Sequence, residues 1–264
     1  VAGTTGEGQS LSISERVELA GRVKDRHPSL SLMAATGFNA LPDTIEASRR
    51  MLSLGVDSLL GAPPCFFPSG NAEVFAFFSA LAEALPDEAR LVMYHIPRYT
   101  GAPVSIETAR HLREEVGPVI AGLKDSGGQR EYFEQALAEL QDLALYGSDG
   151  VAELAFAQGA TGVISALANV VPNAFLELEK AVSRPGGQDP AEVRGTLAAI
   201  RALTHSVPQR SGLKYLAHLL ADIPQTCARP PELDLQPSQI ESLRTSETIR
   251  QLRQRTRPLR TTGT

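Results

Sequence analysis

The sequence has few cysteines and no long uninterrupted apolar segment, and each shortage excludes a class of protein. Cys65 and Cys227 are far apart and have no CxxC or histidine-rich neighbourhood, which excludes a disulfide framework and a zinc site. Gly, Pro or charged residues interrupt the apolar stretches before they reach the ~18 residues that a transmembrane helix needs. The first residues do not resemble a signal peptide, so we expect a cytoplasmic protein.

The net charge is weakly negative, at −5 from 25 basic and 30 acidic residues. This balance argues against a general attraction to nucleic acid or to an anionic membrane. The sequence has no P-loop, and no GxGxxG motif follows an expected strand, so no motif supports nucleotide binding. With 42% hydrophobic and 21% charged residues, the composition is that of a globular protein with a sizeable core.

Short apolar runs rich in β-forming residues alternate with longer amphipathic stretches in most of the chain. This alternation is typical of βα units built around a parallel sheet. We expect strands at 30–35, 58–62, 90–95, 119–123, 143–146 and 162–165. We expect helices at 12–26, 42–54, 71–85, 105–115, 129–140, 149–158 and 172–183, of which the first begins with a capping box of Ser12 and Glu15.

A turn-rich segment at 184–190 ends this alternation, and only helical patterns follow it, at 191–204, 212–220 and 239–253. We therefore expect a βα barrel over 1–183 and a helical extension over 184–264. A (β/α)₈ barrel typically needs about 250 residues, whereas residues 1–183 correspond to about six βα units. A gap would expose unpaired strand edges, so we expect the native protein to have a further N-terminal strand and helix.

Lysine is scarce, so amine chemistry depends on Lys24, Lys124, Lys180 or Lys214. Lys124 ends an apolar strand, at the edge where parallel α/β folds have their active sites, whereas the other three lie in expected amphipathic helices. Burial disfavours a charged ammonium, and the neutral amine is the form that attacks a ketone to give a Schiff base. The alternative is a structural ion pair with Asp125 or Glu153.

Other expected strand ends also carry polar groups. Thr4 and Thr5 lie in a glycine-rich segment that is suited either to binding a carboxylate or to a turn with a helix cap. Tyr94 ends the third strand, where a phenol either moves protons or packs with its hydroxyl bonded. We expect His95, the next residue, to face the opposite side of the sheet as a structural histidine. Glycines at Gly147 and Gly162 are weak signals on their own.

Five segments in chain order resemble the dihydrodipicolinate synthase and N-acetylneuraminate lyase family. They are GTTGE at 3–7, YHIPRYTG at 94–101, GLKDSGG at 122–128, GSD at 147–149 and GATGVISALANV at 159–170. The resemblance implies a (β/α)₈ TIM barrel with a C-terminal helical extension, usually in a homotetramer or dimer. It also implies a lysine that forms an imine with pyruvate or another 2-oxo acid, without a metal or organic cofactor.

The family's functional residues fall on matching positions of this sequence. By resemblance, Lys124 is the Schiff-base lysine, and Tyr94 relays protons to and from the substrate. The paired threonines match as well, with Thr4 assisting the relay and Thr5 holding the pyruvate carboxylate. The remaining matches line the pyruvate pocket, and they are Gly147 and, through its backbone, Ile164.

Two departures bear on the substrate. Family members that make dihydrodipicolinate carry an arginine where this sequence has Tyr99, and here the arginine is Arg98, one residue earlier. They also carry a pair of tyrosines in the segment that corresponds to residues 63–68, and here that segment has no side-chain hydroxyl. We therefore predict cleavage of a 4-hydroxy-2-oxo acid, of the 2-keto-3-deoxy sugar acid or 4-hydroxy-2-oxoglutarate type, to pyruvate and an aldehyde. The alternatives are 4-hydroxy-tetrahydrodipicolinate synthase, which condenses pyruvate with aspartate semialdehyde, and a non-catalytic relative.

Overall fold

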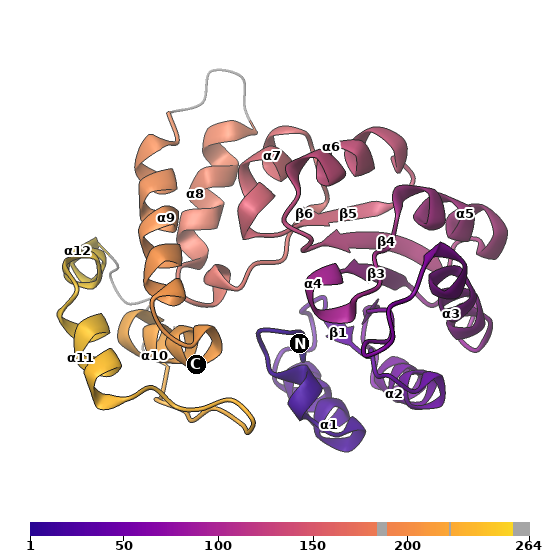
Figure 1. The fold of residues 1–264 in the computed structure, drawn as a ribbon, viewed down its shortest axis with the longest axis horizontal. Helices are drawn as coiled ribbons and strands as arrows, with labels where there is room; N and C mark the ends of the chain where they lie inside the picture. Colours follow the sequence, from indigo (N-terminus) through magenta and orange to yellow (C-terminus); the bar gives the residue numbers. More distant parts are fainter. Residues whose placement is uncertain (184–188, 222, 256–264) are drawn as a thin grey trace. The chain divides into compact units, whose positions relative to one another are not determined.

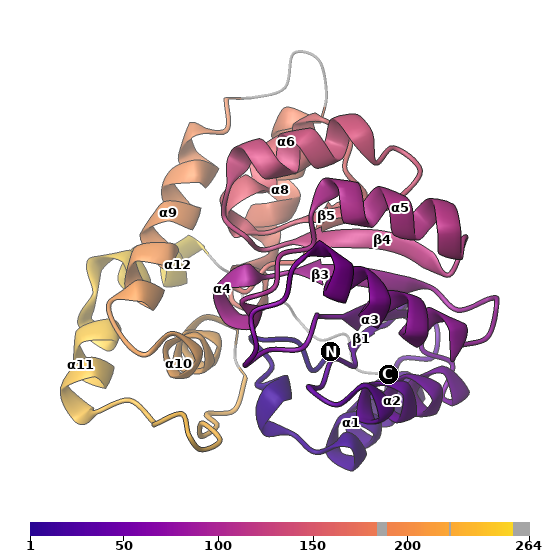
Figure 2. The ribbon, with the colours of Figure 1, turned by 45° about the vertical axis from the view of Figure 1, so that its right-hand side comes forward.

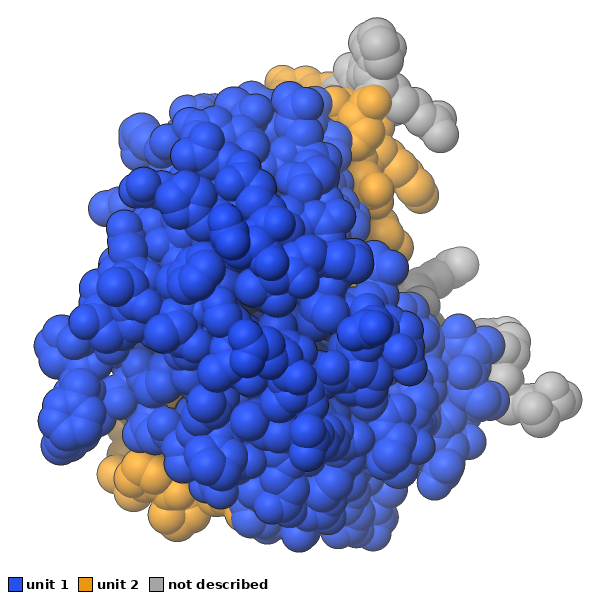
Figure 3. Space-filling model, turned by 90° about the vertical axis from the view of Figure 1, so that its right-hand side faces the viewer, with its two compact units in different colours: residues 1–164 blue, residues 165–264 orange. Residues whose placement is uncertain are grey.

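The computed structural model describes residues 1–183, 189–221 and 223–255. Contacts divide the chain into two compact units, residues 1–164 and 165–264, which Figure 3 colours separately. This division falls earlier than the predicted boundary after residue 183, because α8 (Pro172–Val182) packs on α9 (Ala191–His205). Residues 184–188 of the expected linker lie outside the described residues.

The first unit contains a parallel sheet of six strands, which pair in the order in which they occur in the chain (Figure 1). All six overlap the predicted strands, so the α/β class and the parallel arrangement are confirmed. Val1 lies along the other edge of β1, where its carbonyl accepts a hydrogen bond from the Ala35 N–H at 3.0 Å. The strands are β1 (Met33–Ala35), β2 (Ser58–Gly61), β3 (Leu91–His95), β4 (Ile120–Asp125), β5 (Ala144–Gly147) and β6 (Gly162–Val163).

Helices connect successive strands, as the alternating pattern predicts. The capping box is confirmed, because the Glu15 N–H donates to Ser12 Oγ at 3.3 Å and the Ser12 N–H donates to Glu15 Oε2 at 2.9 Å. A single turn, α4 (Pro97–Thr100), was not predicted; it ends at Gly101, whose φ is 66°. The others are α1 (Ile13–Arg26), α2 (Leu41–Ser53), α3 (Asn71–Glu83), α5 (Ile106–Val116), α6 (Arg130–Glu139) and α7 (Ala152–Ala157), with 3₁₀ turns at Gly8–Ser10 and Asp149–Val151.

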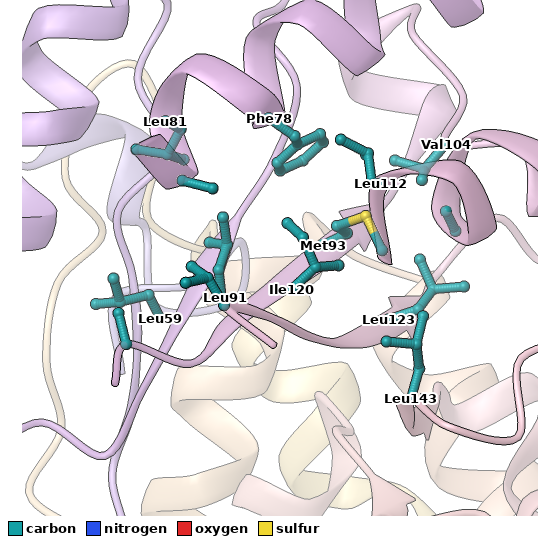
Figure 4. Close-up of a cluster of buried hydrophobic side chains, with 14 of the residues drawn as sticks. Leu59, Phe78, Leu81, Leu91, Met93, Val104, Leu112, Ile120, Leu123 and Leu143 are labelled. Carbon is teal, nitrogen blue, oxygen red and sulfur yellow. The ribbon is translucent and has the colours of Figure 1, made fainter. Parts of the chain in front are cut away.

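The main core fills the space between the helices and the outer face of the sheet. Figures 1 and 2 show α3 and α5 along the same side of the strands. Figure 4 shows Phe78 of α3 and Leu112 of α5 among strand side chains such as Met93. Burial of each large apolar side chain contributes about 1.5–3 kcal/mol. The alternate strand residues form a smaller cluster on the inner face, which contains Ala35, Leu60, Val92, Tyr94 and Ile96.

A β-bulge shifts the pairing of β3 and β4. Leu91 lies opposite Ile120, but Val92 lies opposite Gly122, so Ala121 is one extra residue in β4. A Cβ on Gly122 would lie 2.4 Å from the carbonyl oxygen of Ala144, which excludes a side chain there. Beyond the bulge, each of the last residues of β3 has a definite partner in β4.

The second unit is helical, as predicted. It contains α8, α9, α10 (Gln209–Ala221), α11 (Pro237–Thr245) and α12 (Glu247–Arg255), together with a 3₁₀ turn at Leu167–Asn169. The single helix predicted over 239–253 is wrong, because Ser246 has an extended ψ of 132° and separates α11 from α12. Within the described residues, every helix is too short or too polar to span a bilayer.

Candidate active site

Lys124 and Tyr94 lie side by side at the carboxyl ends of β4 and β3. The two residues are register partners, and the Lys124 Nζ lies 4.1 Å from the centre of the Tyr94 ring. Each residue is only 6% exposed. An ammonium over an aromatic face is attracted by the ring, and the phenol lies within reach of a substrate bound at the amine. The two residues that the sequence marks as reactive are thus neighbours at the ends of adjacent strands.

Thr4 brings a second hydroxyl to the same place. Its Oγ1 lies 3.3 Å from the Tyr94 hydroxyl, and either oxygen can donate. The surrounding loop closes on itself, because the Gly8 N–H donates to the Gly3 carbonyl at 3.1 Å. A Cβ on Gly8 would lie 1.8 Å from the Ala2 carbonyl oxygen, so this turn requires glycine. Thr5 is half-buried in the same loop.

Gly147 and Ile164 lie at the neighbouring strand ends. The Ile164 N–H donates to the Gly147 carbonyl at 2.9 Å, so the backbone at the end of β5 is joined to the residue that follows β6. A Cβ on Gly147 would lie 3.0 Å from Val151 and 3.1 Å from Ala155, on the helix side of the sheet. The absence of a side chain at Gly147 thus serves helix packing. Because the Ile164 N–H is used in this bond, the carbonyl oxygen is the backbone group that Ile164 can offer to a ligand.

The two segments that depart from the family pattern are more open. Tyr99 lies on α4 with 48% of its surface exposed, and the Arg98 guanidinium lies 5.6 Å from its ring centre. In the described part of the chain, no hydrogen bond joins Tyr99 to Lys124, Tyr94 or Thr4. After β2, Phe66 and Phe67 stack edge to face at 5.0 Å and are 84% and 73% exposed.

Tyr146 is a site residue that sequence reasoning missed. It is the register partner of Lys124 on the other side, in β5, and its ring packs with the inner-face cluster. Lys124 therefore has a phenol on each neighbouring strand, at Tyr94 and at Tyr146. The sequence gives little signal for it, because Tyr146 ends the apolar run 143–146 and resembles a core residue there.

His95 and Asp125 lie on the opposite face, as predicted for His95. Burial lowers the pKa of His95 to about 4 and raises the pKa of Asp125 to about 6. Asp125 follows Lys124 directly in a strand, so the two side chains point to opposite faces. This geometry argues against the alternative in which Asp125 is the ion-pair partner of Lys124.

Comparisons with known proteins show to which family the chain belongs. Residues 1–251 match the model of the dihydrodipicolinate synthetase family. An uncharacterised DapA-like lyase of Chloroflexus aurantiacus is 35% identical over 92% of this chain and 81% of its own length. A 4-hydroxy-tetrahydrodipicolinate synthase of Macrococcus caseolyticus is 30% identical over 83% of this chain and 74% of its own length.

A solved structure shares the fold. YagE, a prophage protein of Escherichia coli K12 crystallised in complex with pyruvate, superposes with a TM-score of 0.86 at 21% identity, covering 95% of this chain and 85% of its own. At that identity the likeness concerns the fold alone, which is TIM-barrel-like. The family match over nearly the whole chain and the relatives above 30% identity go further. This protein belongs to the dihydrodipicolinate synthetase family and is an enzyme of the lyase type.

Proposed function

We propose that the protein is a class I aldolase that cleaves a 4-hydroxy-2-oxo acid to pyruvate and an aldehyde through a Schiff base on Lys124. The observation that carries this proposal is the buried amine of Lys124, which lies 4.1 Å from the ring of a tyrosine whose hydroxyl is 3.3 Å from Thr4. An amine and a pair of hydroxyls at one point are the groups that imine chemistry with proton transfer requires.

The first step joins the substrate to the enzyme. The neutral Lys124 amine attacks the C2 carbonyl of the 2-oxo acid, and the carbonyl oxygen leaves as water with one proton from the amine and one that Tyr94 relays from solvent. The product is a protonated imine. Because the imine nitrogen withdraws electrons, the bond between C3 and C4 becomes breakable. We assign the carboxylate of the substrate to Thr5 and the neighbouring loop N–H groups, with Gly147 and Ile164 lining the pocket through their backbone.

Cleavage then requires a proton to leave the C4 hydroxyl. Tyr94 accepts that proton as it passes its own to Thr4, and Thr4 releases one to solvent. The C3–C4 electron pair forms the C2–C3 double bond, the imine π pair moves to nitrogen, and the aldehyde departs. The resulting enamine takes a proton back at C3, and water hydrolyses the imine to release pyruvate and the free amine. Atoms and charge balance with protein groups and water alone, so the proposal includes no cofactor.

Substrate choice rests on the departures. An exposed Tyr99 in place of an arginine supplies no positive charge for a second carboxylate, and the 63–68 loop supplies no phenol. Both favour an aldehyde fragment without the charge pattern of aspartate semialdehyde. On this ground a 2-keto-3-deoxy sugar acid fits better than 4-hydroxy-2-oxoglutarate, whose aldehyde fragment also carries a carboxylate.

Synthesis of 4-hydroxy-tetrahydrodipicolinate is the second candidate, because the relative from Macrococcus caseolyticus has that name. The two activities separate in one assay set. Purified protein is incubated either with 4-hydroxy-2-oxo acids, with pyruvate release measured, or with pyruvate plus aspartate semialdehyde, with the condensation product measured. Faster condensation than cleavage would overturn the aldolase proposal in favour of the synthase.

The family match argues against the non-catalytic alternative, and borohydride trapping tests the Schiff base itself. The protein is mixed with pyruvate, reduced with sodium borohydride and analysed by peptide mass spectrometry. We expect one adduct, on the peptide that contains Lys124. The absence of an adduct, or an adduct on another lysine, would overturn the Schiff-base proposal. Because Phe66 and Phe67 are exposed, we also expect a homo-oligomer, a dimer or tetramer, by analytical ultracentrifugation.

A further inference from the structure

A second group of titratable side chains lies directly behind the reaction centre. His95 follows Tyr94 in β3, and Asp125 follows Lys124 in β4. They are register partners on the outer face and are 4% and 0% exposed. The proposed reaction uses neither residue. Buried polar groups need partners, since a group without one loses its hydrogen bonds to water.

The ring of His95 is fixed on two sides. Its Nδ1 accepts the Val104 N–H at 3.1 Å, and its face stacks on the Tyr132 ring at 4.0 Å and 12°. The Tyr132 hydroxyl in turn donates to the Val104 carbonyl at 2.6 Å. Since Nδ1 accepts, the neutral ring carries its proton on Nε2. His95 is therefore held so that one donor, Nε2–H, has a fixed direction.

The carboxyl of Asp125 is only half satisfied. Its Oδ1 accepts the Gly127 N–H at 2.7 Å, and its Oδ2 is buried without a hydrogen-bond partner among the described residues. A buried carboxyl oxygen in that state is costly unless a donor reaches it. The Asp125 carboxyl is therefore oriented by one hydrogen bond, and its second oxygen lacks a donor among the described residues.

Gly127 shows that the two groups border the same small space. A Cβ on Gly127 would lie 2.6 Å from His95 Nε2 and 3.2 Å from Asp125 Oδ1. Any side chain at this position would therefore enter the space between the imidazole and the carboxyl. Glycine keeps that space open between them, although no hydrogen bond joins Nε2–H to the carboxyl among the described residues.

We infer that His95 and Asp125 form a positioning pair. In this pair the Nε2–H of His95 donates a hydrogen bond to the Asp125 carboxyl, and this bond fixes Tyr94 against Lys124. The pair acts through the backbone, because each of its members is one peptide bond from a reacting residue. Just beyond the paired residues of β3 and β4, one backbone hydrogen bond joins the two strand ends among the described residues: the Ser126 N–H donates to the His95 carbonyl at 2.8 Å. The inference rests on the proposed Schiff-base function.

Matched substitutions of His95 test which ring nitrogen matters. His95→Gln places an amide near the position of Nε2, His95→Asn places one near Nδ1, and His95→Leu removes both. We expect His95→Gln to keep kcat within about 3-fold, and the other two to lower kcat by about 10- to 100-fold with little change in KM, because misplaced reacting groups slow the chemical step. If His95→Asn keeps kcat and His95→Gln loses it, the important contact is the one between Nδ1 and the Val104 N–H, and the proposed pair is overturned.

Asp125→Asn gives the complementary test, because its amide N–H₂ would face the Nε2–H donor. We expect this variant to lose kcat, and Asp125→Asn with His95→Gln to recover most of it, since the glutamine amide can turn its oxygen to the asparagine. The same variants are unfolded in urea without substrate. There, a loss of unfolding free energy in the single variant and its recovery in the double variant report the contact itself. Failure of the double variant to recover in both measurements would overturn the pair.

Failure of this inference is distinguishable from failure of the proposed function. A wild-type protein that traps pyruvate on Lys124, with wild-type kcat in every His95 variant, would overturn the positioning pair alone. A wild-type protein that traps nothing would overturn the function, and the urea series would still decide the contact.

Discussion

The two faces of the β3–β4 pair carry titratable groups one residue apart, and they hold them in different ways. On the inner face, Lys124 and Tyr94 meet through a ring contact and a single hydroxyl from Thr4. On the outer face, backbone groups and a stacked ring fix His95, and a backbone N–H holds Asp125. Under the proposed function the inner groups exchange partners with a substrate, whereas the outer groups stay in place.

The largest expected effect is on the inner face. Lys124→Arg keeps a positive charge at the site but cannot form an imine, so we expect kcat/KM for cleavage to fall by about 10⁴-fold or more. Pyruvate release and borohydride adducts measure it. Lys180→Arg, in α8, is the control and should retain both. Activity of Lys124→Arg within tenfold of the wild type would contradict a covalent role.

Tyr94→Phe is expected to separate imine formation from bond cleavage. The ring remains beside the lysine but the relay hydroxyl is lost, so kcat should fall by about 10²- to 10³-fold. Trapping of pyruvate on Lys124 should stay within a few-fold of the wild type. The exposed Tyr99 supplies a matched control, because Tyr99→Phe should change kcat little. An unchanged rate in Tyr94→Phe would remove this tyrosine from the mechanism.

The outer face should instead appear in the pH dependence of stability. Asp125 has a raised pKa, so its contribution is fully present below pH 3.8 and is lost as the pH rises through about 6. His95 has a lowered pKa, so its contribution is present above pH 6.5 and is lost as the pH falls through about 4. In the wild type, these opposing trends largely offset each other between pH 4 and 6.

Single variants should expose each trend. As the pH falls from 6.5 to 4, the free energy of unfolding should decrease by about 2–3 kcal/mol in Asp125→Asn and increase in His95→Gln, each relative to the wild type. Urea unfolding at four pH values in that range measures both. Parallel profiles for the two variants would show that the buried charges do not titrate as proposed.

Tyr146→Phe is the smallest change and asks whether the second phenol beside Lys124 takes part. Tyr146 is half-buried and packs on the inner face, and we expect kcat to fall by about 3- to 10-fold, with trapping retained. Steady-state kinetics on the cleavage substrate measure this effect. An effect as large as that of Tyr94→Phe would mean that the two tyrosines share the relay.

Much of this comparison could be predicted from the sequence, because it depends on periodicity. Alternation in β3 places His95 opposite to Tyr94, and an apolar run that ends on Lys124 predicts a buried amine; both are confirmed. The short turn α4 and the break at Ser246 were missed, because one turn has too few residues to show a helical period and a serine fits both helix and cap.

Contacts between distant segments were beyond the sequence. The approach of Thr4 to Tyr94 depends on a loop and a strand 90 residues apart. The role of Tyr146 depends on the register between β4 and β5, which no local pattern specifies. Tyr146 resembles a core residue in the apolar run 143–146, and only its strand partner shows which face it occupies.

The bulge at Ala121 decides which face of the sheet Lys124 occupies. If all the residues of β4 were kept but paired without a bulge, the match of Leu91 with Ile120 would continue in phase, and Lys124 would lie opposite His95, turned toward the helices. Deletion of Ala121 would instead remove the bulge and leave Lys124 opposite Tyr94 in a regular ladder. The length of the strand and its bulge therefore have to change together if the lysine is to stay on the inner face.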